Sequence, residues 1–219
     1  GGLSHFPRSR LLCVEQTANR GGGSVYPLET LWALGAVGRD EGLALHLDGA
    51  RLFNAAVALG LPPSALAEPF DSISFCLSKG LGCPVGSLLV GRRVFIDRAH
   101  RFRKMFGGGM RQAGVLAAAG IHALENHVDR LADDHARARR LAVGLAALPG
   151  LAVDPTRVET NMVYVGLVGR PGHAAEEFLA SRGILAHATG PSELRLVTHL
   201  DVDDAGIDAT LEAFAALPA

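Results

Sequence analysis

The chain of 219 residues is 48% hydrophobic and carries 21 basic and 22 acidic side chains, which gives a formal net charge of −1. A chain of this length and composition suffices for a substantial core and one or two domains. Its near-zero charge gives no general attraction to nucleic acid or to an anionic membrane, so neither is expected as a partner.

The three cysteines indicate a reducing compartment. Cys13, Cys76 and Cys83 are odd in number and show no CxxC spacing, so we expect free thiols and a cytoplasmic protein. No apolar run reaches membrane-spanning length, and no secretory signal is recognised. The sequence begins Gly1-Gly2 without Met, which we interpret as a truncated or processed start.

The first half of the chain predicts alternating strands and helices. Strands are expected at 10–15, 43–48, 73–77 and 87–90, and helices at 27–41 and 52–59 with a short turn after Pro62-Pro63. Nearly continuous apolar strands in such an alternation predict an α/β fold with a parallel or mixed sheet covered on both faces. Functional residues of these sheets lie at the carboxyl ends of the strands, where Asp48 and Lys79 occur.

The second half predicts a smaller α+β domain. A basic helix at 94–104 and a glycine hinge at 107–109 precede one very long helical stretch at 110–148. The elements expected after Pro149-Gly150 are strands at 162–167, near 184 and at 194–198, and helices at 172–182 and from 203.

Lys79 follows an apolar strand and precedes a glycine-rich turn with Gly80 and Gly82. Burying an ammonium group costs several kcal/mol unless it is paired or neutralised. A lysine in this position can form a Schiff base with a carbonyl cofactor. The alternative is a loop lysine that extends into water.

The run Asp48-Gly49-Ala50-Arg51 also follows an apolar strand. Asp48 can pair with the nitrogen of a pyridine ring, and the small residues after it let a flat molecule approach the backbone. Arg51 is placed for an anion. The alternative is a helix N-cap aspartate beside a surface arginine.

Three further cations are candidates for binding anions. Arg195 interrupts an apolar strand, although an edge-strand charge is the alternative. Lys104 and Arg111 flank the glycines at 107–109, whose free amides suit a phosphate, although a hinge beside a solvated basic face is the alternative. RNA binding by the basic run at 92–104 is disfavoured, because its phenylalanines fall near helical spacing and indicate core anchors.

The histidines do not predict a metal site. His122 and His127 are five residues apart and would point about 140° from each other on a helix, so we expect two surface histidines. His46 shares a strand face with the acid at position 48, where a hydrogen bond near the site is the simplest role. His199 lies four residues beyond Arg195, and its role stays open.

Four runs of the sequence resemble low-specificity L-threonine aldolases, at residues 46–56, 76–87, 103–112 and 195–202. These are pyridoxal 5′-phosphate (PLP) enzymes of the aspartate aminotransferase fold, and the resemblance extends over nearly the whole chain. It implies the C-terminal part of a PLP fold-type-I large domain, with a mixed, mostly parallel sheet, over residues 1–106. A long linking helix and a small α+β C-terminal domain are implied over 107–219.

The resemblance also implies a function and residue roles. The reaction would be retro-aldol cleavage of L-threonine or L-allo-threonine to glycine and acetaldehyde, in a homo-oligomer of two or four subunits. The implied roles are Lys79 as the Schiff-base lysine, Asp48 on the pyridinium nitrogen, Arg51 beside ring and substrate, Arg195 on the substrate carboxylate, and Lys104 and Arg111 at the phosphate.

Two departures from that family favour alternatives. The family shows a Glu-Asn-Thr-His-Asn run, whose histidine is a candidate acceptor of the hydroxyl proton, but here Ala18 occupies that position. The family also has a longer N-terminal part with a phosphate-binding loop. There are therefore two alternatives to a threonine aldolase: a catalytically impaired fragment, and another fold-type-I PLP lyase or transaminase. Loss of the first strands and helices would also expose an apolar sheet face and a strand edge.

Overall fold

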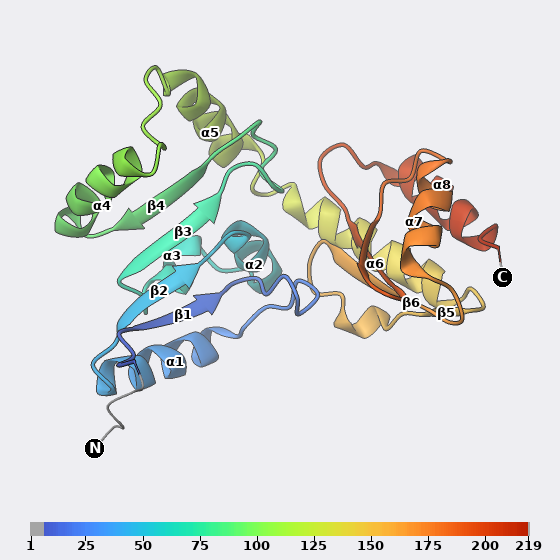
Figure 1. The fold of residues 1–219 in the computed structure, drawn as a ribbon, viewed down its shortest axis with the longest axis horizontal. Helices are drawn as coiled ribbons and strands as arrows, with labels where there is room; N and C mark the ends of the chain where they lie inside the picture. The colour runs from blue at the N-terminus through green and yellow to red at the C-terminus, as the bar shows by residue number, and fades with distance from the viewer. Residues whose placement is uncertain (1–6, 219) are drawn as a thin grey trace.

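The computed structural model describes residues 7–218, and Gly1-Gly2 lie outside them. Two four-stranded sheets lie side by side, joined through helix α6 (Figure 1). The first half contains β1 (Leu11–Glu15), α1 (Leu28–Asp40), β2 (Ala44–Asp48), α2 (Leu52–Leu59), α3 (Pro63–Ala67), β3 (Ser72–Cys76), β4 (Ser87–Gly91), α4 (Arg93–Met105) and α5 (Gly114–Asn126). The second half contains α6 (Leu131–Ala146), β5 (Leu151–Ala152), a 3-10 turn η1 (Pro155–Arg157), β6 (Met162–Leu167), α7 (Gly172–Ala180), β7 (His187–Gly190), β8 (Glu193–Val197) and α8 (Asp204–Ala215).

The first sheet has the strand order β1-β2-β3-β4 and is mixed, mostly parallel, as predicted. Strands β1, β2 and β3 run parallel, and β4 returns antiparallel beside β3. Glu15, Asp48 and Ser74 are register partners across the three parallel strands. The carboxyl ends of these strands therefore meet at one edge, and the chain continues from β3 into the Lys79 turn at that edge.

One face of the first sheet is covered and the other is open. Side chains alternate between the faces of a strand, and those on the covered face pack against α1, α2 and α3, with Leu31, Leu45, Leu47 and Leu66 at most 1% exposed. On the opposite face Leu11 is 51% exposed and Leu89 is 41% exposed. The prediction of a sheet covered on both faces is wrong for the described residues, because α1, α2 and α3 all pack on one face. The expected exposed apolar face is confirmed.

The second sheet is antiparallel and encloses a complete core of its own. Its strand order is β5-β6-β8-β7. Side chains from β6 and β8 pack with α6, α7 and α8 in one buried cluster that includes Leu145, Val165, Leu179, Leu194 and Ile207. This half is the α+β unit that the sequence predicts. No helix among residues 7–218 is long and apolar enough to cross a membrane.

The single helix predicted for residues 110–148 is two helices. Residues 110–113 are not helical, α5 ends at Asn126, and α6 begins at Leu131. Neither glycine nor proline marks the break at 127–130. It arises from tertiary packing, since α5 packs against the buried cluster of the first half whereas α6 packs into the core of the second.

Candidate active site

A cavity of about 350 Å³ lies between the two halves of the molecule. The first half contributes the turn after β3, and the second half contributes the ends of β6 and β8. It is lined by Arg51, Ser78, Lys79, Gly80, Gly82, Cys83, Asn161, Val197, His199, Leu200 and Asp201. The cavity thus places the predicted lysine and one predicted arginine together, and Asn161 beside them was not identified from the sequence.

Lys79 is exposed at the cavity wall, and its backbone lies in a tight turn. The Gly82 amide donates to the Lys79 carbonyl at 2.8 Å, and the Cys83 amide donates to the Leu77 carbonyl at 3.1 Å. Gly82 has a φ of +74°, a conformation that favours glycine. The sequence left open whether this lysine serves a cofactor site or extends into water from a loop. Because its amine reaches an open cavity, the cost of burying a charge does not arise here.

Asp48 lies at the end of β2 on the open face of the first sheet. One carboxylate oxygen, Oδ1, accepts a hydrogen bond from the Ala50 amide at 3.1 Å. Asp48 does not line the cavity of Lys79, although both follow parallel strands at the same sheet edge. Gly49 is required by strand packing, since a Cβ there would lie 3.0 Å from the Ser74 carbonyl oxygen. The glycine therefore serves a close backbone contact within the sheet.

Arg51 and Arg195 come from different halves and act on each other electrostatically. Burial lowers the pKa of Arg51 first and the neighbouring Arg195 charge lowers it further, against the opposing effect of groups that include Glu15. Arg195 donates from Nη1 to Asn19 Oδ1 at 3.0 Å, while its buried Nε has no partner among the described residues. Two neighbouring guanidinium groups with a spare buried donor suit a carboxylate or another anion.

Lys104 and Arg111 are exposed and lie away from the lining of the cavity. Lys104 is in the last turn of α4 and covers Gly109, where a Cβ would lie 2.6 Å from its Cδ. Within one chain the structure does not bring either cation to Lys79. Their role at a phosphate stays a prediction that depends on a second subunit.

The glycine loop after β1 contacts the second half through residues that the sequence did not single out. The Thr160 hydroxyl donates to the Gly23 carbonyl at 2.7 Å, and the Tyr164 hydroxyl donates to the Asn19 carbonyl at 3.0 Å. Ala18 pairs with Ser24 in an isolated bridge and carries no group that takes a proton. The only signal for Tyr164 and Thr160 in the sequence is their position in or just before a predicted strand.

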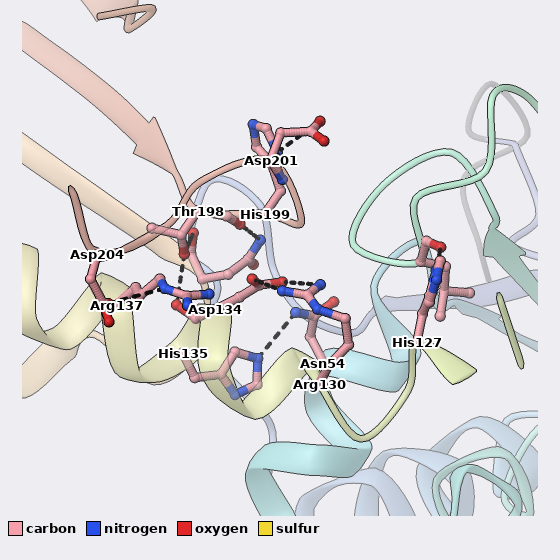
Figure 2. Close-up of polar contacts among 12 residues, drawn as sticks. Asn54, His127, Arg130, Asp134, His135, Arg137, Thr198, His199, Asp201 and Asp204 are labelled. Atoms are coloured by element: carbon pink, nitrogen blue, oxygen red, sulfur yellow. Dashed lines mark hydrogen bonds and ion pairs between the residues drawn. The ribbon is translucent and has the colours of Figure 1, made fainter. Parts of the chain in front are cut away.

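Polar contacts beside the cavity lie both between the two halves and within the second half (Figure 2). Asn54 of α2 donates from Nδ2 to Nε2 of His135 at 3.1 Å, and both side chains are buried. Arg130 pairs with the buried carboxylate of Asp134. The hydroxyl of Thr198 donates to the Asp134 carbonyl at 2.7 Å, which ties the end of β8 to α6. The bond between Asn54 and His135 therefore joins the two halves, and the other two contacts hold α6 and the end of β8 together within the second half.

The remaining histidines have different surroundings. The ring of His46 lies between Ser72 and Ser74, with ring nitrogens 2.8 and 3.4 Å from the two hydroxyl oxygens, which matches the predicted hydrogen bond. His199 lines the cavity, and its Nδ1 accepts from the Asp201 amide at 3.3 Å. Residues 7–218 hold no group of three or more potential metal ligands.

The prediction that His122 and His127 point apart is wrong. Their ring centroids are 5.2 Å apart. A spacing of five residues separates two side chains only where the helix continues. Because α5 ends at Asn126, His127 is outside the helix and its ring turns toward His122.

The fold and the cavity define an α/β protein of PLP fold type I. A threonine aldolase from Leishmania major has the same fold, with a TM-score of 0.79 and 20% identity over 98% of this chain and 63% of that one. The chain belongs to the beta-eliminating lyase family, whose model matches residues 1–167. Membership of that family implies PLP as the cofactor.

Curated relatives confirm the resemblance to low-specificity L-threonine aldolases. The enzyme of that name from Escherichia coli K12 is 48% identical over 198 residues, which are 90% of this chain and 57% of the relative. Low-specificity L-threonine aldolase 1 of Arabidopsis thaliana is 41% identical over 216 residues, which are 97% of this chain and 60% of the relative. The chain therefore spans about 60% of the length of the curated relatives that it matches.

Proposed function

We propose that the protein is a PLP-dependent aldehyde-lyase that cleaves L-threonine or L-allo-threonine into glycine and acetaldehyde. The observation that carries this proposal is the cavity that Lys79 shares with Arg51, beside the second guanidinium of Arg195. The names of the relatives support the substrate.

The residues present fit PLP by their chemistry. Lys79 offers an exposed amine for a covalent bond to the cofactor aldehyde, and Asp48 offers a carboxylate at the same sheet edge for the pyridine nitrogen. When bound, the cofactor supplies the sink that accepts the electrons of the broken Cα–Cβ bond. Lys79 and Asp48 would hold it, and the carboxylate of Asp48 would keep the ring nitrogen protonated.

The arginines would position the substrate. A guanidinium group matches a carboxylate with two parallel hydrogen bonds, so Arg195 would fix the substrate carboxylate with Arg51 beside it. Fixing that group sets the direction of the Cα–Cβ bond, and such orientation supplies a large part of enzymatic rate enhancement. The Nε of Arg195, buried and without a described partner, is available for this contact.

The proton of the β-hydroxyl group needs an acceptor other than residue 18. Alanine at this position takes no proton, so a water molecule or another group at the cavity would serve as the base. Lys79 would hold the cofactor again through its Nζ once glycine has left.

Domain limits, subunits and location complete the proposal. We place the partial large domain at residues 1–106 and the linking helices with the small domain at 107–219. The exposed Lys104 and Arg111 are assigned to the cofactor phosphate of a neighbouring subunit, which requires a homo-oligomer of two or four chains. The free thiols of the described cysteines support the cytoplasm as its location.

The product analysis tests this function. The protein is incubated with PLP and L-threonine, and glycine, acetaldehyde and keto acid are quantified. We expect glycine and acetaldehyde in equal amounts, no keto acid, and no product from Lys79→Ala. Keto acid without aldehyde would instead indicate a transaminase of the same fold. Absence of every product would indicate a catalytically impaired fragment.

A further inference from the structure

His127 is hydrogen-bonded to the turn that carries Lys79. Its Nδ1 lies 2.7 Å from the carbonyl oxygen of Leu81, two residues after the lysine. Because a carbonyl only accepts, Nδ1 must carry the proton and donate. Figure 2 shows this imidazole apart from the cluster around Arg130 and Asp134, so it belongs to a separate contact.

The same turn is anchored to α5 by a second bond and by buried packing. The thiol of Cys83 donates to the Ala119 carbonyl at 3.4 Å. Burial raises the pKa of the Cys83 thiol, which keeps it protonated as the donor. Leu81 and Ala123 are 3% and 1% exposed in the cluster that joins the turn to α5. The Lys79 turn therefore packs directly against helix α5.

Residues at the end of α5 and the start of α6 contact both glycines of the Lys79 turn. A Cβ on Gly82 would lie 3.5 Å from Nδ1 of His127, and a Cβ on Gly80 would lie 2.8 Å from a methyl carbon of Leu131. The His127 amide donates to the Ala123 carbonyl at 2.8 Å, which fixes the histidine at the end of α5. The residues between the two helices therefore contact the lysine turn directly, and the His127 imidazole donates a hydrogen bond to its Leu81 carbonyl.

We propose that His127 is a positioning residue for Lys79. Its Nδ1–H bond to the Leu81 carbonyl holds the Lys79–Gly82 turn in the conformation that presents the lysine amine to the cavity. The inference rests on the proposed function only in taking PLP as the molecule that Lys79 binds. It concerns attachment of the cofactor and does not depend on the substrate.

Two conservative variants separate this role from a general effect on stability. In His127→Asn the amide nitrogen is as many bonds from Cα as Nδ1, so the bond to Leu81 is kept. In His127→Gln that nitrogen is one bond further away, so the bond is lost. His173→Gln, at an exposed position of α7, is the matched control. Thermal unfolding of all variants is measured in parallel.

The rate of covalent attachment of PLP to Lys79 is the primary measurement, followed by absorbance and confirmed by borohydride reduction and peptide mass. We expect His127→Gln to attach about tenfold more slowly or worse, and His127→Asn and His173→Gln to remain within about threefold of wild type, since a misplacement near 1 Å costs up to about a hundredfold. Equal unfolding temperatures for the two His127 variants would exclude a stability effect.

Two results would overturn the inference. One is attachment to His127→Gln at the wild-type rate, and the other is equal slowing in His127→Asn and His127→Gln. If attachment depends on His127 as expected but threonine is not cleaved, the positioning role stands and the proposed function fails. If the wild-type chain forms no adduct at Lys79, both fail.

Discussion

Helices cover one face of each of the two sheets, and the sheets differ in the side chains on the other face. The second sheet buries Leu194 and Val165 against helices on one face, and its other face carries the polar side chains Tyr164 and Arg195. The first sheet packs helices on one face and leaves Leu11 and Leu89 exposed on the other. The predicted chemical groups come from both sheets, since Lys79 and Asp48 follow strands of the first and Arg195 lies on the second.

The buried core of the second half and the strand ends of the first sheet are expected to have different roles. A closed core tolerates little change in volume, because interiors are packed as densely as crystals of small molecules. An open sheet edge instead leaves polar groups free to meet a ligand. We therefore expect stability to depend mainly on the second sheet and function mainly on the edge of the first, and the following predictions test that contrast.

The largest effect on stability is expected in the second sheet. Leu194→Ala removes a side chain that is 0% exposed, and a cavity of this kind costs about 2–5 kcal/mol of unfolding free energy. Urea denaturation measures the change, with Leu185→Ala, at a side chain 87% exposed, as the control. A loss below about 1 kcal/mol would show that the second core is not as closed as described.

The junction between the halves predicts a loss of stability in acid. Burial, and then the charge of Arg139, lower the pKa of His135 from 6.5 to about 4. Below pH 6.5 the His135 imidazole therefore binds a proton in the unfolded chain but stays neutral in the folded chain. The unfolding free energy falls as the pH drops from 6.5 toward 4. The expected loss is about 3 kcal/mol.

The control for this prediction is His135→Gln, which does not titrate. Unfolding free energies of both proteins are measured in urea at several pH values across the window. The wild type should lose more stability than the variant toward the acidic end. Parallel curves would show that His135 is not held neutral by the junction.

A smaller effect, on substrate binding, is expected for Arg195→Lys in the second half. The substitution keeps the positive charge but removes the guanidinium group, which can donate two parallel hydrogen bonds to a carboxylate. We expect the KM for L-threonine to rise by about thirtyfold, which corresponds to about 2 kcal/mol, with stability changed little. Steady-state kinetics and thermal unfolding measure the two effects, and an unchanged KM would remove Arg195 from the substrate carboxylate.

The smallest effect is expected on the open face of the first sheet. Leu89→Thr alters an exposed side chain on an edge strand and should change the unfolding free energy by at most about 0.5 kcal/mol. Urea denaturation of this variant and of Leu194→Ala compares the loss of unfolding free energy in the two sheets directly. A loss comparable with that of Leu194→Ala would mean that this face is covered in solution.

The sequence predicted elements well wherever local signals act alone. The helix at 52–59 and the strand at 162–167 have the predicted bounds, and Asp48 ends β2 as expected, whereas Lys79 lies in the turn after β3. The proximity of Arg51 and Arg195 comes from the packing of two halves, which no local pattern encodes. The helix break at 127–130 was missed for the same reason, because α5 packs in the first half and α6 packs in the second.

The central claim is that Lys79 is the residue that binds PLP, and its most direct test is reductive trapping. The protein is incubated with PLP, reduced with borohydride, digested and mapped by mass spectrometry, with Lys79→Arg and Lys104→Arg as paired variants. We predict a phosphopyridoxyl mass on the Lys79 peptide of the wild type and of Lys104→Arg, and none at that position in Lys79→Arg. Labelling spread over surface lysines, with the Lys79 peptide unmodified, would contradict the account.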